Sequence, residues 1–261
     1  MLKKRIIFSL LYKDGIYCLS RNFRLQEVGD IKWLLKNYNF EDLSGAIDEL
    51  IILNVGSRNI SNKQFFSDIE QITKNFFVPI TIGGKIRSVN DASLYFLSGA
   101  DKVSINTLYT ENEIIASEIS EKYGSQAVIA SLDYKKIMID NTCIYKSYEN
   151  ESKKLGLDLL DQIKKVQKIG CGEILLRSIE NDGTGNGLDL GFLELIPNDL
   201  LTVPLIYAGG IGKSDHILSG LMSSKIDAVC TANLLNFTNR GLTRARKELE
   251  AKDLPISKIS L

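Results

Sequence analysis

The chain has 261 residues, of which 44% are hydrophobic and 25% are charged, so it is long enough for a sizeable core and too apolar to be disordered as a whole. Its 32 Lys and Arg balance its 32 Asp and Glu, and a chain without net charge has no strong field to attract nucleic acid or an anionic membrane. Four scattered cysteines, one histidine and no Cys-x-x-Cys pair argue against a metal site or a disulfide framework and indicate a reducing cytoplasm. No apolar run approaches the roughly 18 residues of a membrane helix, and the short run that begins at residue 6 ends too soon for a signal peptide.

Short apolar runs alternate with longer amphipathic stretches along the chain. The runs predict eight strands, at residues 5–11, 49–55, 80–83, 102–106, 127–133, 173–178, 205–209 and 228–231. Helical patterns lie between most of them, at 67–75, 89–98, 111–123, 157–169 and 215–222. Eight strands that alternate with helices predict an α/β fold of the (β/α)8 TIM barrel type. A doubly wound open sheet is the competing fold, but it usually has fewer strands in a chain of this length.

An internal repeat supports the barrel. Four segments of the first half return in order in the second: 9–13 as 131–135, 48–52 as 172–176, 78–84 as 203–210 and, more loosely, 101–104 as 227–230. The offset is close to 125 residues throughout, which is half of the chain. We therefore expect a single domain over residues 1–261, made of two half-barrels at about 1–124 and 125–261.

The repeat places a Gly-Gly pair after equivalent strands of the two halves. Glycines at this position let backbone amides approach an anion, and the N-terminus of the next helix adds positive potential. Polar residues that end the following strands could complete each cradle. The residues are Gly83, Gly84, Asn106 and Thr107 in the first half and Gly209, Gly210 and Asn233 in the second. Two related cradles predict a small ligand with a phosphate at each end, although the glycines could instead only make tight turns.

Two aspartates are candidates for chemistry at the same end of the barrel. Asp133 ends the fifth predicted strand, where a carboxylate can transfer protons or can simply accept hydrogen bonds from loop amides. Its equivalent in the first half is Leu11, so these two positions cannot supply a pair of carboxylates. Asp182 lies in a glycine-rich loop after the sixth strand and could bind a ligand or make an Asx turn.

Four charged residues stand near the start of otherwise apolar strands, at the opposite end of the barrel. They are Arg5, Glu49, Lys102 and Glu173, two cations and two anions. Burying four charges is costly unless they pair, so the pattern predicts a closed ring. The ring is either a polar aperture or a set of ordinary salt bridges on the stabilising face of the barrel.

At these residues the chain resembles the HisF family, the cyclase subunits of imidazole glycerol phosphate synthase. The resemblance covers nearly the whole chain, and its combination of motifs is specific. The matching stretches are 4–7, 13–15, 48–50, 99–107, 124–128, 172–176 and 182–184. The sister isomerase family, HisA, shares the half-barrel repeat but not residues 124–126 in combination with the charged ring.

The resemblance implies a barrel that docks on a HisH-type glutaminase as a heterodimer, with no cofactor and no metal. Ammonia would pass through a gate formed by the charged ring and react at the other mouth with a two-phosphate ribulosyl substrate. It further implies that Asp101 and Gln126 face the glutaminase and that Asp133 is one of two catalytic aspartates. The implied ligand-binding positions are Asn106, Thr107, Asp182, Gly209 and Gly210.

The departures from the family pattern lie at the mouth where the chemistry would take place. Leu11 stands where the family has its other catalytic aspartate, and loss of a general acid or base commonly costs about 10²–10⁴ in rate. Leu19 replaces a ligand-contacting lysine, and Asn54 replaces an aspartate. Lys85 replaces a third glycine, and Arg177 adds a further cation, so the two could bind an anionic ligand of different shape.

The same pattern resembles the HisF paralogues that accompany surface-sugar gene clusters, in which ammonia is thought to reach an amidotransferase that makes acetamidino sugars. The first hypothesis is therefore an ammonia-supplying synthase subunit for amidino-sugar and surface polysaccharide biosynthesis, with a sugar amidotransferase as a possible further partner. The second is a histidine-pathway cyclase that tolerates Leu11. The third is a non-catalytic ammonia conduit and docking scaffold.

Overall fold

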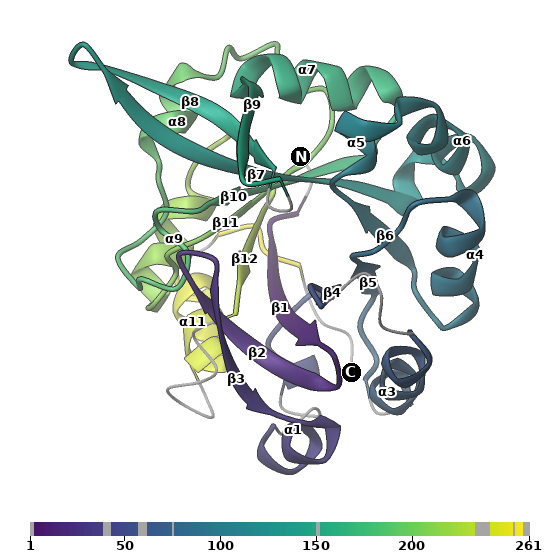
Figure 1. Ribbon diagram of the computed structural model, residues 1–261. Coiled ribbons are helices and arrows are strands. Elements are labelled where there is room, and N and C mark those ends of the chain that lie inside the picture. The colour runs from purple at the N-terminus through teal and green to yellow at the C-terminus, as the bar shows by residue number, and fades with distance from the viewer. Residues whose placement is uncertain are drawn as a thin grey trace.

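The computed structural model describes residues 3–38, 43–56, 62–74, 76–149, 152–232, 241–252 and 254–257. Eight parallel strands pair in sequence order, and the last pairs with the first, so the sheet closes (Figure 1). They are β1 (Arg5–Lys13), β4 (Glu49–Asn54), β5 (Ile80–Gly83), β6 (Lys102–Ile105), β7 (Val128–Ile139), β10 (Glu173–Ser178), β11 (Leu205–Ala208) and β12 (Ala228–Thr231). The predicted (β/α)8 barrel is confirmed, and every predicted strand coincides with one of these. The division into half-barrels near residue 124 stays a prediction.

Helices cover the outside of the barrel (Figure 1). They are α1 (Ile31–Asn37), α3 (Lys63–Thr73), α4 (Val89–Leu97), α5 (Leu108–Glu111), α6 (Glu113–Tyr123), the 3₁₀ turn η1 (Ser125–Ala127), α7 (Leu159–Ile169), α8 (Gly191–Leu195), α9 (Ser214–Leu221) and α11 (Gly241–Glu250). Side-chain caps fix several starts: Asp30 accepts from the Trp33 amide, and Ser88 accepts from the Asp91 amide. The sequence pattern missed α1 and α8, which are too short to show a helical period. None of the described helices is long and apolar enough to cross a membrane.

Two β-hairpins extend the barrel at equivalent places in the two halves. The first is β2 (Ile16–Arg21) with β3 (Arg24–Gly29), and it follows β1. The second is β8 (Thr142–Glu149) with β9 (Lys154–Asp158), and it follows β7. The paired ends of β7 and β8 extend beyond the ring of helices in Figure 1. None of the four hairpin strands is among the eight strands that the sequence predicted. The first hairpin forms the wall of the candidate site described below.

The apolar core has two layers, because alternate residues of each strand point into the barrel or out toward the helices. The inner layer fills the barrel, and Leu11 packs against it. Its members are Ile7, Ile51, Leu53, Ile129, Leu175, Ile206, Ala208, Ala228 and Cys230. The interior therefore separates two polar regions, one at each end of the strands.

Candidate functional site

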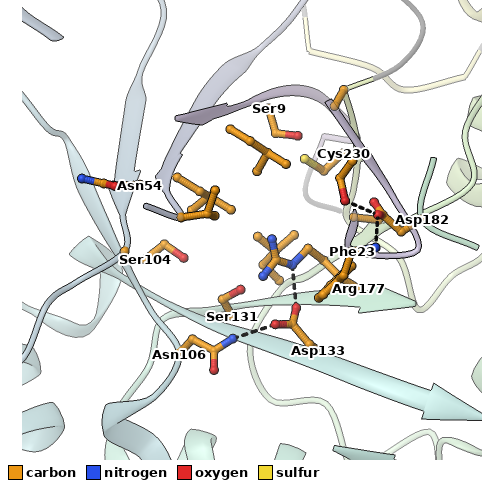
Figure 2. Close-up of a pocket in the computed structure, with 18 of the residues that line it drawn as sticks. Ser9, Phe23, Asn54, Ser104, Asn106, Ser131, Asp133, Arg177, Asp182 and Cys230 are labelled. Atoms are coloured by element: carbon orange, nitrogen blue, oxygen red, sulfur yellow. Dashed lines mark hydrogen bonds and ion pairs between the residues drawn. The ribbon is translucent and has the colours of Figure 1, made fainter. Parts of the chain in front are cut away.

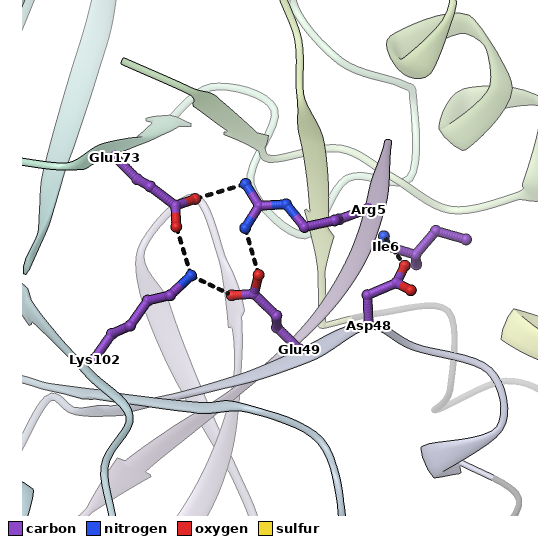
Figure 3. Close-up of polar contacts among 6 residues, drawn as sticks. All are labelled: Arg5, Ile6, Asp48, Glu49, Lys102 and Glu173. Carbon is purple, nitrogen blue, oxygen red and sulfur yellow. Dashed lines mark hydrogen bonds and ion pairs between the residues drawn. The ribbon is translucent and has the colours of Figure 1, made fainter. Parts of the chain in front are cut away.

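The four predicted ring residues meet at the N-terminal end of the strands (Figure 3). Arg5 donates from Nη2 to Glu173 Oε2 at 2.6 Å, and its Nη1 donates to Glu49. Lys102 Nζ lies 3.1 Å from Glu49 Oε2 and also donates to Glu173. Each carboxylate thus receives one hydrogen bond from each cation, and the ring closes on itself without net charge.

The ring is stable as a set of charges because every member is paired. Both glutamates are buried, and both cations are half-buried. Burial alone raises the pKa of Glu173, but the hydrogen bond and charge of Arg5, together with Lys102, outweigh it and hold that pKa below its ordinary value of 4.5. Removing one member of such a group leaves its partners charged in a poorly solvated place, which is far more costly than removing an exposed charge.

Aspartates beside the ring fix the ends of the strands. Asp48 accepts from the Ile6 amide at 2.7 Å and from both terminal nitrogens of Arg246 (Figure 3 shows the Asp48–Ile6 contact). Asp101 accepts from the Ile80 amide at 2.7 Å and lies exposed next to Lys102. Gln126, in η1, is exposed and directly precedes β7. Both residues predicted to face a partner therefore lie at the ring end of the barrel.

A pocket of about 430 Å³ opens at the other end of the strands. That volume falls in the range of small-molecule sites, and in a barrel this end is where ligands bind. The pocket brings together most of the predicted ligand residues: Gly84, Lys85, Asn106, Thr107, Asp133, Arg177, Asp182, Gly209 and Gly210. Leu11, Leu19 and Asn54 also line it. Gly83 is not part of the lining and packs in β5 against Ser104, while Asn233 lies outside the described residues.

Asp133 lies in the pocket with both oxygens engaged (Figure 2). Its Oδ1 accepts from Arg177 Nε at 2.7 Å, and its Oδ2 accepts from Asn106 Nδ2 at 3.0 Å. The Asp133 side chain is only 1% exposed. Burial alone lowers the pKa of Arg177, but the charge and hydrogen bond of Asp133 outweigh it and raise that pKa above its ordinary value. The sequence identified both residues but not the ion pair between them.

The glycine pairs at the rim are required by the backbone. Gly84 has φ +92°, and a Cβ there would come within 2.0 Å of the Asn54 carbonyl oxygen. Gly210 has φ +94°, and a Cβ there would come within 2.0 Å of the Gly187 carbonyl oxygen. Only glycine adopts such turns without strain, so the two positions need it whether or not an anion binds. Lys85 follows with φ +59°, where a non-glycine residue is costly, and it places a cation in the pocket lining.

Asp182 holds the first hairpin over the pocket. Its Oδ2 accepts from Ser20 Oγ at 2.5 Å and from the Phe23 amide at 3.0 Å (Figure 2). Asn22 adds hydrogen bonds to the carbonyl oxygens of Ile179 and Glu180. The Phe23 ring lies 5.3 Å from the Arg177 guanidinium carbon, within the range of a cation–π contact. Phe23 could not be identified from the sequence pattern, because its place depends on a contact between distant loops.

The described residues contain no group of histidine, cysteine and acidic side chains that could hold a metal ion. The polar side chains and backbone amides of the pocket can bind anions, form hydrogen bonds and transfer protons.

Comparisons with known proteins point to one family. Residues 12–240 match a family model described as "Histidine biosynthesis protein". The chain is 43% identical over 256 residues to the "Putative imidazole glycerol phosphate synthase subunit hisF2" of Parasynechococcus marenigrum. The alignment covers 96% of this chain and 91% of that relative. It is 35% identical over 257 residues to the "Imidazole glycerol phosphate synthase subunit HisF" of Chlorobium phaeovibrioides and 34% identical over 257 residues to that of Chlorobium luteolum. Each of these two alignments covers 98% of this chain and 99% of the relative.

We predict that Glu173→Gln lowers the free energy of unfolding near pH 7 by about 3–5 kcal/mol, because it leaves the ring with two cations and one anion. The folded pKa of Glu173 lies below its unfolded value of about 4.3, so its ionised form stabilises the fold fully above that pH. That contribution is lost as the pH falls through the folded pKa. Urea unfolding at pH 7, 4 and 3 should therefore show a penalty that shrinks toward pH 3.

The matched control is Glu113→Gln, which removes the exposed member of a pair with Lys165 and should change stability by less than about 1 kcal/mol at every pH. Equal effects of the two substitutions at pH 7, or a Glu173→Gln penalty that does not depend on pH, would contradict a buried and ionised ring.

Proposed function

This chain belongs to the HisF family of imidazole glycerol phosphate synthase subunits, and from that membership and its geometry we propose that it is the ammonia-receiving subunit of a glutamine amidotransferase complex. The observation that carries the proposal is the closed ring of four charges at one end of the barrel interior, opposite a ligand-sized pocket at the other. A ring for stability alone would not need a pocket on the same axis.

The proposed partner is a HisH-type glutaminase that docks on the ring end of the barrel. Two large apolar side chains there are almost fully exposed, Phe77 at 88% and Leu97 at 83%. Phe77 precedes β5, and Leu97 ends α4 just before β6, so both lie at the N-terminal end of the strands with Asp101. Exposed apolar side chains rimmed by polar residues are typical of protein interfaces.

The ring and the interior together suit ammonia better than ammonium. The paired charges present no free site for an ion, and the interior beyond them is lined by Ile7, Ile129 and Ile206. A neutral molecule crosses such a region at a much lower desolvation cost than a cation. These apolar side chains fill the space between the ring and the pocket, so passage requires the ring and the side chains above it to move. Lys102 is the suited gate, because its single flexible chain can leave the ring while Arg5 still bridges the two glutamates.

At the mouth, we propose that the two glycine turns are separate anion-binding cradles, and that the backbone amides of a turn, with the cation of Lys85 beside the first, bind a phosphate of a small ligand. Because Leu11 removes one carboxylate, the ammonia is used or passed on in a reaction other than the usual cyclisation. We place that reaction in amidino-sugar biosynthesis for surface polysaccharides, with a sugar amidotransferase as the further partner.

A second candidate is the cyclase of histidine biosynthesis itself. It is favoured by the names of the relatives and by Asp133, Asn106 and both glycine turns in one pocket. Expression of the chain with its glutaminase in a histidine auxotroph that lacks HisF separates the two: growth without histidine would support the cyclase. A non-catalytic conduit is distinguished by assaying glutamine hydrolysis in the complex, with and without the two-phosphate ribulosyl substrate or inorganic phosphate. A scaffold without a ligand site would show no response to either compound.

We predict that Lys102→Ala uncouples the complex. Removal of the Lys102 cation opens the ring and leaves two carboxylates facing the interface, so ammonia escapes to solvent. The measurement is the rate of glutamine hydrolysis in the complex, followed as release of glutamate and free ammonia, with and without the ligand of the pocket. In Lys102→Ala the ratio of these two rates should fall several-fold. The control is Lys164→Ala on the exposed face of α7. Unchanged coupling in Lys102→Ala would count against the gate.

We predict that Leu97→Asp weakens binding of the glutaminase by at least about tenfold, because a charge would be buried in the apolar part of the interface. Binding is measured by isothermal titration calorimetry with the purified subunits. Ile114→Asp is the matched control, since Ile114 is also exposed but lies at the start of α6, away from the ring end. Equal affinities for the wild type and Leu97→Asp would place the glutaminase elsewhere.

A further inference from the structure

The Arg177 guanidinium lies in the middle of the pocket and is only partly used by the protein (Figure 2). Its Nε donates to Asp133, but among the described residues neither Nη1 nor Nη2 has a hydrogen-bond partner. The side chain is half-buried and lines the pocket, with the Phe23 ring on one side. Asp133 holds the guanidinium through its Nε, and the two Nη groups remain available. Two coplanar donors of this kind are suited to bidentate binding of an anion.

Asp133 is engaged in holding that guanidinium. One oxygen accepts from Arg177 and the other from Asn106, and the side chain is almost fully buried. With both oxygens engaged in this way, the Asp133 side chain fixes the orientation of the Arg177 guanidinium. The geometry therefore suits Asp133 as a positioning residue that acts through Arg177 better than as a proton carrier.

Two serine hydroxyls in the same pocket also lack partners. Ser104 Oγ and Ser131 Oγ are buried and make no hydrogen bond within the described part of the chain. Both residues line the pocket: Ser131 lies on β7, two residues before Asp133 and paired with Leu175 of β10, and Ser104 lies on the adjacent strand β6. Figure 2 shows both hydroxyls among the side chains around the guanidinium. Leaving a buried hydroxyl without a partner destabilises the fold, so such groups are expected where a ligand satisfies them.

The charge balance at this depth allows an anion to enter. Asp133 is the carboxylate paired with the Arg177 guanidinium, and Leu11 adds no second carboxylate beside it. The charge of Asp182 also acts on Arg177, but its Oδ2 already accepts hydrogen bonds from Ser20 and Phe23. The neighbouring walls, such as Leu53 and Leu175, are apolar. A carboxylate has two oxygens with about four acceptor positions. The two Nη groups of Arg177 and the hydroxyls of Ser104 and Ser131 are four donors, which match these four positions. The glycine turns at the rim are then available to bind a phosphate.

We propose that Arg177, Ser104 and Ser131 form a carboxylate-binding site deep in the pocket, so that the ligand of this barrel is a phosphorylated acid, with the carboxylate inside and the phosphate at the rim. The inference deepens the proposed function and rests on it only for the phosphate-binding rim, not for ammonia delivery.

The test compares two probes that differ only at one end: 6-phosphogluconate, which has a carboxylate, and sorbitol 6-phosphate, which has a hydroxymethyl group there. Isothermal titration calorimetry on the isolated chain should show that 6-phosphogluconate binds at least about tenfold more tightly, as expected for charge-assisted hydrogen bonds. Ser104→Ala with Ser131→Ala should reduce this preference. Asp133→Asn with Arg177→Leu removes the whole ion pair without leaving an unpaired charge, and it should abolish the preference.

Equal affinity for the two probes would overturn the carboxylate site while leaving the phosphate-binding rim intact. Failure of both probes and of inorganic phosphate to bind at millimolar concentrations would overturn the rim as well. Tighter binding of fructose 1,6-bisphosphate than of 6-phosphogluconate, lost in the double variant, would show that the deep site takes a phosphate and would also overturn the assignment.

The positioning role of Asp133 has its own readout. Asp133→Asn retains an oxygen that can accept from Arg177 Nε, so it should keep most of the preference for 6-phosphogluconate, whereas Asp133→Ala should lose it. A preference that Asp133→Asn keeps and Asp133→Ala loses would show that Asp133 orients Arg177. Circular dichroism of both variants checks that neither has lost its fold. An unchanged preference in Asp133→Ala would rule out the positioning role.

Discussion

The buried ring of two cations and two glutamates is the interaction on which the rest of this barrel depends. It is neutral only as a complete set, and its members start four different strands, β1, β4, β6 and β10. The ring therefore ties together both halves of the barrel at one end. A closed set of charges costs little once paired but is costly to break, so any function that opens it must supply a compensating contact, which a docked partner can provide.

The two ends of the barrel carry their charges differently. At the ring end, four charges pair in a closed set without net charge. At the pocket end, Lys85 and Arg177 lie in a lining that also contains Leu11, and only the Nε edge of the Arg177 guanidinium is engaged by Asp133. The ring end therefore suits a function that depends on the set staying closed, whereas the pocket end has cationic groups available to an anionic ligand.

Local pattern and the internal repeat predicted the eight strands and the glycine turns, because each depends on residues close in sequence or related by the repeat. The ring was predictable because each of its members starts a strand, and a barrel gathers the starts of its strands at one end. Long-range contacts were not predictable in this way. The hydrogen bond from Ser20 to Asp182 joins strand β2 to the loop after β10, and the pair between Arg177 and Asp133 joins two strands. The sequence placed Asp182 and Asp133 at the correct end of the barrel, but what each carboxylate binds depends on neighbours that only the fold brings together.

The structure of this chain bound to its HisH-type glutaminase is the measurement that tests the central claim most directly. We predict that the glutaminase covers the N-terminal end of the strands and that its active-site opening faces the ring formed by Arg5, Glu49, Lys102 and Glu173. A glutaminase bound over the pocket or on the outer helices, with the ring left in solvent, would contradict it.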